Sequence, residues 1–342
     1  MFALQPTLIR LVAAVLCGSL LSSAFAADGD WEVVTAELLK TEKPGYGGLC
    51  GVLVDPATGT VYLNLSDKGL YASSDRCKTF KRLSDKGLKG RTETPGCLMM
   101  DPVGQSKKIV TALVYGAPIS VSTDQGATWK MMDGKSGHVD WFAVDWTDPD
   151  NKFVMALKHE AADLLLVSHD GGKTFGELGK GYGPAWIFDN QTAVVSQAKN
   201  KDNPKPGILR TTDGAKTFKP VAEGFIAGKA LPKYRDGVLY WLVDGALIST
   251  ADKGVTWKKV SDLKDGRYGP IFGKDAKHLF VLTGAGIVES TDGGSNWSKP
   301  IAPPKDLKGV SALTWIEYDP KHDDLYVMKM TSELFKLARA GK

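Results

Sequence analysis

The sequence has 342 residues, of which 43% are hydrophobic, 24% are charged and 9% are aromatic. This composition is typical of a globular protein with a large core, and it excludes a disordered, collagen-like or coiled-coil chain. The length allows two ordinary domains or one large all-β domain. The formal net charge of +4 is too small to predict a nucleic-acid partner.

Residues 1–26 have the pattern of a secretory signal peptide. Arg10 precedes an apolar run over 11–21, and a small-x-small cleavage pattern ends at Ala26. We therefore expect cleavage near Ala26 and a secreted or periplasmic mature protein over 27–342. No later stretch reaches the roughly 20 apolar residues that a membrane-spanning helix needs, so the sequence predicts no membrane span.

Three cysteines follow the leader, so at most one internal disulfide can form. Cys50 and Cys97 each precede an apolar segment that ends in Asp-Pro, which places them on equivalent strands. We expect a disulfide between Cys50 and Cys97, with two buried thiols as the alternative, and Cys77 is left over. The spacing fits no zinc motif, and the sequence predicts no metal site and no cofactor.

One eight-residue pattern recurs six times. Each copy has Ser or Thr first, Asp third and an aromatic residue last, and four copies have Gly fifth. The copies span 73–80, 122–129, 168–175, 211–218, 250–257 and 290–297, and their aspartates are Asp75, Asp124, Asp170, Asp213, Asp252 and Asp292. Successive aspartates lie 39 to 49 residues apart, a regular period that indicates a repeat architecture.

Each copy reads as a hairpin turn, because an alternating apolar run precedes it and a short strand-like run follows it. The Ser/Thr and Asp oxygens can accept hydrogen bonds from turn amides, and the glycine supplies a positive φ. In two copies Cys77 and Ala215 replace this glycine. If they keep the left-handed conformation, each costs about 1–2 kcal/mol.

The repeated pattern resembles the Asp-box, or BNR, repeat of sialidases, sortilin-type receptors, some xyloglucanases and photosystem II assembly-factor propellers. The resemblance implies a β-propeller of four-stranded antiparallel blades in which each box joins the third and fourth strands. It extends over nearly all of the mature chain.

The blade count is seven. Six blades carry boxes, and residues 311–337 supply three strands of a seventh blade that lacks its outermost strand. Residues 31–34 read like the end of a box, so we expect this N-terminal strand to complete the last blade and close the ring. The sequence thus predicts one all-β domain over 27–342, a seven-bladed propeller, with an open solenoid of sheets as the alternative.

The face opposite the boxes is where we expect a ligand site, since loops there enter the inner strands. Aromatic, charged and histidine side chains recur in these segments. The ligand-binding candidates are Tyr46, His138, Asp140, Trp141, Tyr182, Trp186, Lys229, Arg267 and Tyr268. The loop with His159 and Glu160 follows the same blade's second strand, so Asp140, Glu160 and His138 are the candidates for acid–base chemistry. The alternatives are packing between blades for the tyrosines and solvated loop charges for the histidine–carboxylate group.

A typical sialidase is disfavoured, because it needs three arginines on the substrate carboxylate and only Arg91 and Arg267 are clear candidates for this face. We expect a non-catalytic binding or scaffold module, monomeric, that holds a glycan, peptide or protein partner at the channel mouth. The alternative is a glycoside hydrolase with paired carboxylates on the same face.

Overall fold

The computed structural model describes residues 30–83, 88, 90–92, 94–104, 106–113, 119–132, 134, 136–198 and 205–339. The predicted signal peptide, residues 1–26, lies outside this part of the chain. Strands dominate the described residues, which also include one α-helix, α1 (Ala36–Glu42), and two 3-10 turns, η1 (Ser66–Lys68) and η2 (Lys305–Leu307). None of the helices in this part of the chain is long and apolar enough to cross a membrane.

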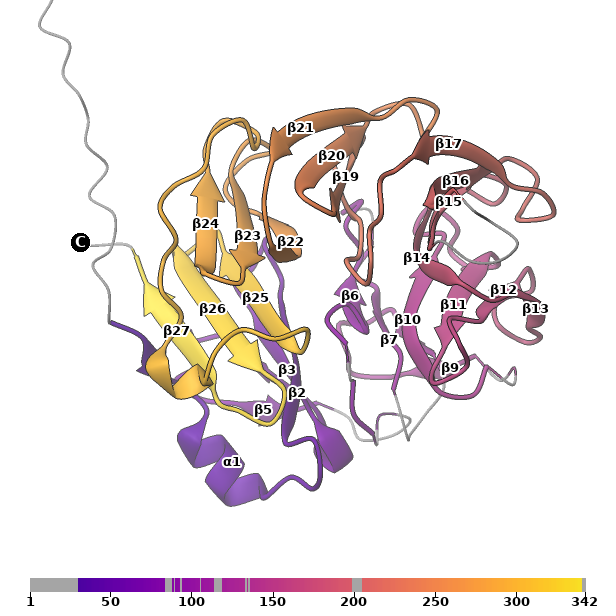
Figure 1. Cartoon of the computed structure of the whole chain (residues 1–342). Coiled ribbons are helices and arrows are strands. Elements are labelled where there is room, and N and C mark those ends of the chain that lie inside the picture. The colour runs from indigo at the N-terminus through magenta and orange to yellow at the C-terminus, as the bar shows by residue number, and fades with distance from the viewer. Residues whose placement is uncertain are drawn as a thin grey trace, which may run out of the picture.

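Seven antiparallel sheets follow one another around a ring, as the colour sequence of Figure 1 shows. The predicted seven-bladed β-propeller is therefore confirmed. Blade 1 contains β2 (Leu49–Val54), β3 (Val61–Leu65), β4 (Gly69–Ser73) and β5 (Lys81–Arg82). Blade 2 contains β6 (Leu98–Met100), β7 (Ile109–Thr111), β8 (Ser120–Ser122) and β9 (Lys130–Met131). Blade 3 contains β10 (Val139–Val144), β11 (Val154–Lys158), β12 (Leu165–Ser168) and β13 (Gly176–Gly179). Blade 4 contains β14 (Tyr182–Ile187), β15 (Ala193–Gln197), β16 (Gly207–Thr211) and β17 (Lys219–Glu223). Blade 5 contains β18 (Lys233–Arg235), β19 (Val238–Val243), β20 (Ala246–Thr250) and β21 (Lys258–Asp262). Blade 6 contains β22 (Gly266–Phe272), β23 (Leu279–Thr283) and β24 (Gly286–Ser290), and blade 7 contains β25 (Thr314–Asp319), β26 (Asp324–Lys329), β27 (Leu334–Ala338) and β1 (Glu32–Val33).

Burial decreases from the first strand of a blade to the last. All six residues of β2 and of β25 are buried, because neighbouring blades cover both faces of these strands. The fourth strands β5 and β9 are exposed. A strand that is covered on both faces is an unbroken apolar run, and this explains why the first strands show little alternation in the sequence.

Blade 6 departs from the predicted four strands, because its sheet has three. A single bridge between Ile287 and Ile301 replaces the fourth strand, with backbone hydrogen bonds of 3.0 and 2.7 Å. Pro300 precedes Ile301 and has no N–H to donate, which limits the pairing at this edge.

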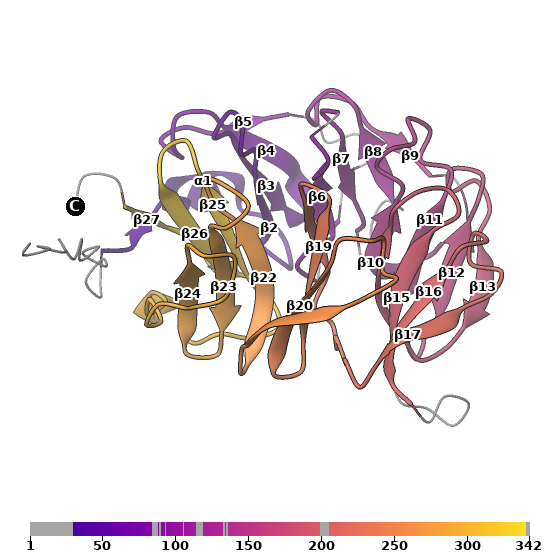
Figure 2. The same ribbon diagram turned by 90° about the horizontal axis from the view of Figure 1, so that it is seen from above.

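The ring closes through β1, as the sequence predicts. Glu32 pairs with Lys336 and Val33 with Phe335 of β27, and both views show the indigo N-terminal segment beside β27 (Figures 1 and 2). Thr35 extends the contact: its hydroxyl accepts a hydrogen bond from the amide of Leu334 at 2.8 Å. The first and last parts of the chain therefore share one sheet.

The six repeated segments form turns of one geometry, and in blades 1 to 5 they join the third and fourth strands. The first hydroxyl of every copy accepts the amide of the fifth residue at 2.7–3.0 Å. The aspartate accepts hydrogen bonds from the side chain and the amide of the seventh residue, and these bonds lower the pKa of each of the six carboxyls to about 2. The fourth and fifth residues are left-handed in all copies, and Cys77 and Ala215, each with φ 66°, keep this conformation without a glycine.

The expected disulfide is wrong, because Cys50, Cys77 and Cys97 are all free and buried thiols. The Cys50 thiol donates to the side-chain oxygen of Asn64 at 2.8 Å, whereas the Cys97 thiol donates to the backbone oxygen of Asp140 at 2.7 Å in the next blade. Equivalent positions in successive blades are held apart by the packing between them, so similar sequence contexts did not imply contact. Burial raises the pKa of Cys50 to about 11 and that of Cys77 to about 12.

Candidate functional site

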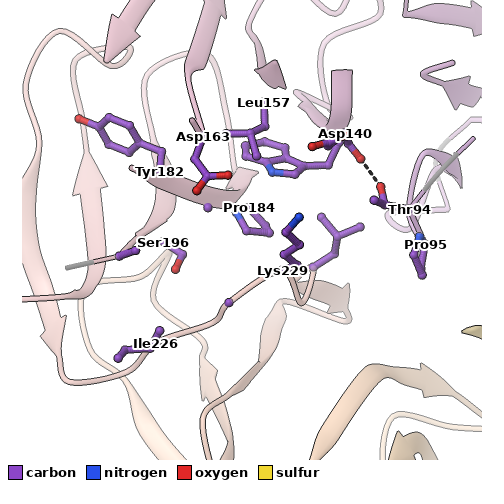
Figure 3. Close-up of a pocket in the computed structure, with 15 residues that line it drawn as sticks. Thr94, Pro95, Asp140, Leu157, Asp163, Tyr182, Pro184, Ser196, Ile226 and Lys229 are labelled. Atoms are coloured by element: carbon purple, nitrogen blue, oxygen red, sulfur yellow. Dashed lines mark hydrogen bonds between the residues drawn. The ribbon is translucent and has the colours of Figure 1, made fainter. Parts of the chain in front are cut away.

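A pocket of about 230 Å³ opens on the face opposite the repeated turns. Segments that enter the first strands of blades 2, 3 and 4 form part of it, and so does the connection from blade 4 to blade 5. We call it the channel-mouth pocket. Its lining residues are Thr94, Pro95, Asp140, Trp141, Leu157, Asp163, Tyr182, Gly183, Pro184, Ser196, Ala198, Ile226, Gly228, Lys229 and Leu231 (Figure 3).

The walls of the channel-mouth pocket are mostly apolar. Trp141, Leu157 and Pro184 lie on strands β10, β11 and β14, and Leu231 precedes β18. Ile226 is one of the few large apolar side chains that stay exposed, at 37%. An apolar wall with a few polar groups is the usual make-up of a small binding site.

Asp140 is held firmly at the edge of the pocket. Its carboxylate Oδ1 lies 2.5 Å from Nδ1 of His159, and Nε2 of the same ring lies 3.7 Å from Oε1 of Glu160. The hydroxyl of Thr94 donates to the backbone oxygen of Asp140, as the dashed line in Figure 3 marks. The predicted meeting of the 138–140 segment with the 158–163 loop is therefore present, and the amide of His159 donates to the backbone oxygen of His138 at 2.8 Å.

Two opposite charges reach the pocket without an ion pair between them. In Figure 3 the side chain of Lys229 extends into the pocket below the carboxylates of Asp163 and Asp140. No described carboxylate lies within 4.0 Å of the Lys229 ammonium, and no described cation lies within that distance of Asp163. Both side chains are exposed, so each is free to meet a group on a ligand.

Trp141 adds an unused donor. Its ring is 4% exposed, and its indole N–H has no hydrogen-bond partner among the described residues. The nitrogen is enclosed by the protein, and a buried donor without an acceptor lowers the stability of the fold. Tyr182 contributes its ring rather than its hydroxyl, which points away from the charged groups in Figure 3.

The structure brings together four of the predicted ligand-binding residues: Asp140, Trp141, Tyr182 and Lys229 all line the pocket. His138 and Glu160 lie beside it through their contacts with His159.

The other four predicted residues lie elsewhere. Tyr46 is 77% exposed under the guanidinium of Arg91, which lies 4.5 Å from its ring centroid. Arg267 pairs with Asp265 at 2.7 Å. Tyr268 is buried, and its hydroxyl accepts a hydrogen bond from Lys233 at 3.1 Å. Trp186 is buried and stacks on Tyr234 with a centroid separation of 5.3 Å. The three tyrosines do not form a common ring, because Tyr182 lines the pocket, Tyr268 is buried within β22, and Tyr46 lies exposed in the loop before β2.

Several pocket residues carry no signal in the sequence. Ser196 lies inside β15, Ile226 and Leu231 lie in the connection between blades 4 and 5, and Thr94 precedes β6. They meet only because the ring places blades 2 to 5 around one opening. Among the described residues no group of three or more His, Cys, Asp or Glu side chains is arranged to hold a metal ion.

A scan of the sequence against protein-family models gives no match, and neither does a comparison with curated protein sequences. The fold is similar to solved propellers. YCF48 from Cyanidioschyzon merolae is 11% identical with a TM-score of 0.51, covering 91% of this chain and 99% of that chain. A structure titled YCF48 bound to D1 peptide is 15% identical with a TM-score of 0.51, covering 87% of this chain and 94% of that chain. The extracellular domain of a one-component system from B. thetaiotaomicron is 10% identical with a TM-score of 0.53, covering 85% of this chain and 38% of that chain.

These similarities show a seven-bladed propeller fold that other proteins use, in one case with a peptide bound. The chain is thus a propeller with a mostly apolar pocket at one mouth of its channel.

Proposed function

We propose that this propeller is a non-catalytic binding module that holds an extended peptide segment of a protein client in the channel-mouth pocket. The observation that carries the proposal is the pocket itself, whose mostly apolar walls are flanked by two unpaired charges of opposite sign, Lys229 and Asp163. A peptide supplies what this combination needs, namely an apolar side chain and charged neighbours.

The size of the pocket supports an apolar side chain as the anchor. Its volume is about 230 Å³, and an apolar cavity of about 150 Å³ is large enough for a benzene ring. A leucine or phenylalanine side chain therefore fits between Trp141, Leu157 and Leu231.

The two charges predict which residues flank the anchoring side chain of the peptide. Lys229 would favour an acidic residue on one side of the anchor, and Asp163 a basic residue on the other. A structure of a similar propeller is titled YCF48 bound to D1 peptide, and this supports the choice of a peptide over a glycan. With the predicted leader, we place this module outside the cytoplasm and expect it to act as a monomer.

The test is selection of peptides from a random display library, followed by affinity measurements. We expect selected peptides to share one large apolar residue with charged neighbours, and the variants Lys229→Glu and Asp163→Lys to reverse the preferred charge on the corresponding side. Lys180→Glu is the matched control, because Lys180 is exposed on a strand-entry segment of the same face but does not line the pocket. Failure to select any peptide would refute the proposal.

One observation keeps the glycoside hydrolase as the alternative: Asp140 and Asp163 line the same pocket, and such enzymes act through two carboxyl groups. Incubation with a mixed oligosaccharide and polysaccharide library, followed by mass spectrometry, separates the two functions. New fragments that disappear with Asp163→Asn would establish the hydrolase. Intact carbohydrates together with selected peptides would support the binding module.

A further inference from the structure

A second pocket, of about 260 Å³, lies on the opposite face of the ring, among the repeated turns. The segments that leave the first strands of blades 2, 3 and 4 meet there with the first hairpin and the repeated turn of blade 5. We call it the turn-face pocket. It shares no lining residue with the channel-mouth pocket, and its argument is independent of the peptide proposal.

Aromatic rings form most of the turn-face pocket. Trp146 follows β10, Trp186 lies near the end of β14, Phe188 follows that strand, and Tyr234 lies in β18. The rings of Trp186 and Tyr234 are stacked, with an interplanar angle of 15°. Three blades therefore contribute rings to one small opening, and the stacking fixes the orientation of Trp186.

Two donors in this pocket are unused. Trp146 is 4% exposed and Trp186 is 6% exposed. Neither indole N–H donates to any described residue. Neither nitrogen is fully enclosed by the described residues, so both remain open to solvent. Because both rings line the pocket, a ligand with oxygen acceptors can bond both.

The charge at the pocket is already balanced. Lys253 is the charged residue among the described lining residues, and its ammonium pairs with Asp189 at 2.8 Å. The backbone oxygen of Lys253 in turn accepts a hydrogen bond from Arg210 at 2.8 Å. These contacts hold the turn in place and leave no free charge for an anionic ligand. A neutral ligand is therefore favoured.

We propose that the turn-face pocket binds one neutral sugar ring. A sugar has an apolar face of C–H groups that packs on aromatic rings and hydroxyl oxygens that accept indole N–H bonds, whereas an apolar side chain would leave both donors unused. The volume exceeds the roughly 150 Å³ that holds one benzene ring, which allows for the hydroxyl substituents. The Thr147 hydroxyl donates to Asp145 at 2.6 Å and can still accept a hydrogen bond from a sugar hydroxyl. The Tyr234 hydroxyl, which bonds no described residue, is a further partner at the rim.

The test uses the indole N–H signals of the ¹⁵N-labelled protein, of which there are nine because the chain has nine tryptophans. Trp146→Phe and Trp186→Phe keep a ring in the pocket, remove one donor each, and assign the two signals. Methyl glycosides of common hexoses, N-acetylhexosamines and pentoses are then titrated up to about 10 mM, a range that detects weak binding. Trp141→Phe is the matched control, because it removes an unbonded indole N–H from the other pocket.

We expect at least one sugar to move the signals of Trp146 and Trp186 and to leave that of Trp141 in place. Each of the two pocket variants should weaken this sugar about fivefold, the effect of one hydrogen bond, while Trp141→Phe leaves its affinity unchanged. The proposal is overturned if no sugar moves either signal, if the Trp141 signal moves instead, or if phenol binds more tightly than every sugar. Thermal unfolding of the variants shows whether a lost response reflects a lost fold.

Discussion

Closure of the ring makes a sharp prediction at Thr35. This residue is fully buried, and its hydroxyl accepts the amide of Leu334 at 2.8 Å while donating to Glu333 at 2.5 Å. The change Thr35→Val keeps the shape of the side chain and removes both hydrogen bonds. It therefore tests the polar contact that joins the N-terminal segment to β27 without creating a cavity.

The magnitude follows from the burial of the two partners. The amide of Leu334 is buried and would lose its acceptor, which costs about 1–3 kcal/mol. The carboxylate of Glu333 is partly exposed, so water can replace the lost donor there. We expect Thr35→Val to lower the free energy of unfolding by about 2 kcal/mol, which is roughly a thirtyfold change in the folded-to-unfolded ratio.

Urea denaturation followed by circular dichroism measures this change. Thr41→Val is the matched control, because Thr41 is an exposed threonine of α1 with no hydrogen-bonded side chain among the described residues. We expect it to change stability by less than about 0.5 kcal/mol. If Thr35→Val were as mild as this control, the contact between Thr35 and β27 would not hold the ring closed.

Three further predictions concern the repeated turns and the buried Glu317 of β25. Ser168→Ala removes the acceptor of the buried Gly172 amide, so it should lower the free energy of unfolding by about 1–3 kcal/mol in denaturant titrations, and an unchanged midpoint would contradict the shared turn geometry. Gln125→Gly should raise the free energy of unfolding by about 0.5–1 kcal/mol, because Gln125 has φ 59° and glycine tolerates this conformation. Destabilisation would show that the Gln125 side chain contributes to the turn. Burial raises the pKa of Glu317 to about 7, so the folded protein keeps a proton that the unfolded chain releases above its usual pKa of about 4.3. The free energy of unfolding should therefore fall as the pH rises from about 4.5 to about 7; Glu317→Gln should flatten this fall, and an identical pH profile would rule out Glu317 as its cause.

The sequence by itself determined the architecture, because the same local chemistry occurs six times. A hydroxyl, an aspartate and a residue that tolerates a left-handed backbone are enough to define each turn, and the regular spacing defines one blade per repeat. The seventh blade and its completion by residues 31–34 followed from the missing outer strand. All of these features depend on contacts within one blade, or on the count of blades, and a linear pattern records both.

The sites depended on the tertiary structure. Asp140, Trp141, Tyr182 and Lys229 were found as candidates because they lie on strand-entry segments, but Ser196 and Leu231 complete the same pocket without any local pattern. The twist of the blades and the alternation of side chains decided which neighbours meet.

Trp186 shows most clearly that a sequence pattern does not decide which side chains meet. The sequence placed it with Tyr182 near the start of the same strand, whereas the strand carries it to the opposite face of the ring, into the turn-face pocket. Cys50 and Cys97 likewise occupy equivalent positions whose separation depends on how two blades pack. Periodicity fixes which residues are equivalent, but distances between blades arise only when the ring closes, since side chains from different blades contact one another only then.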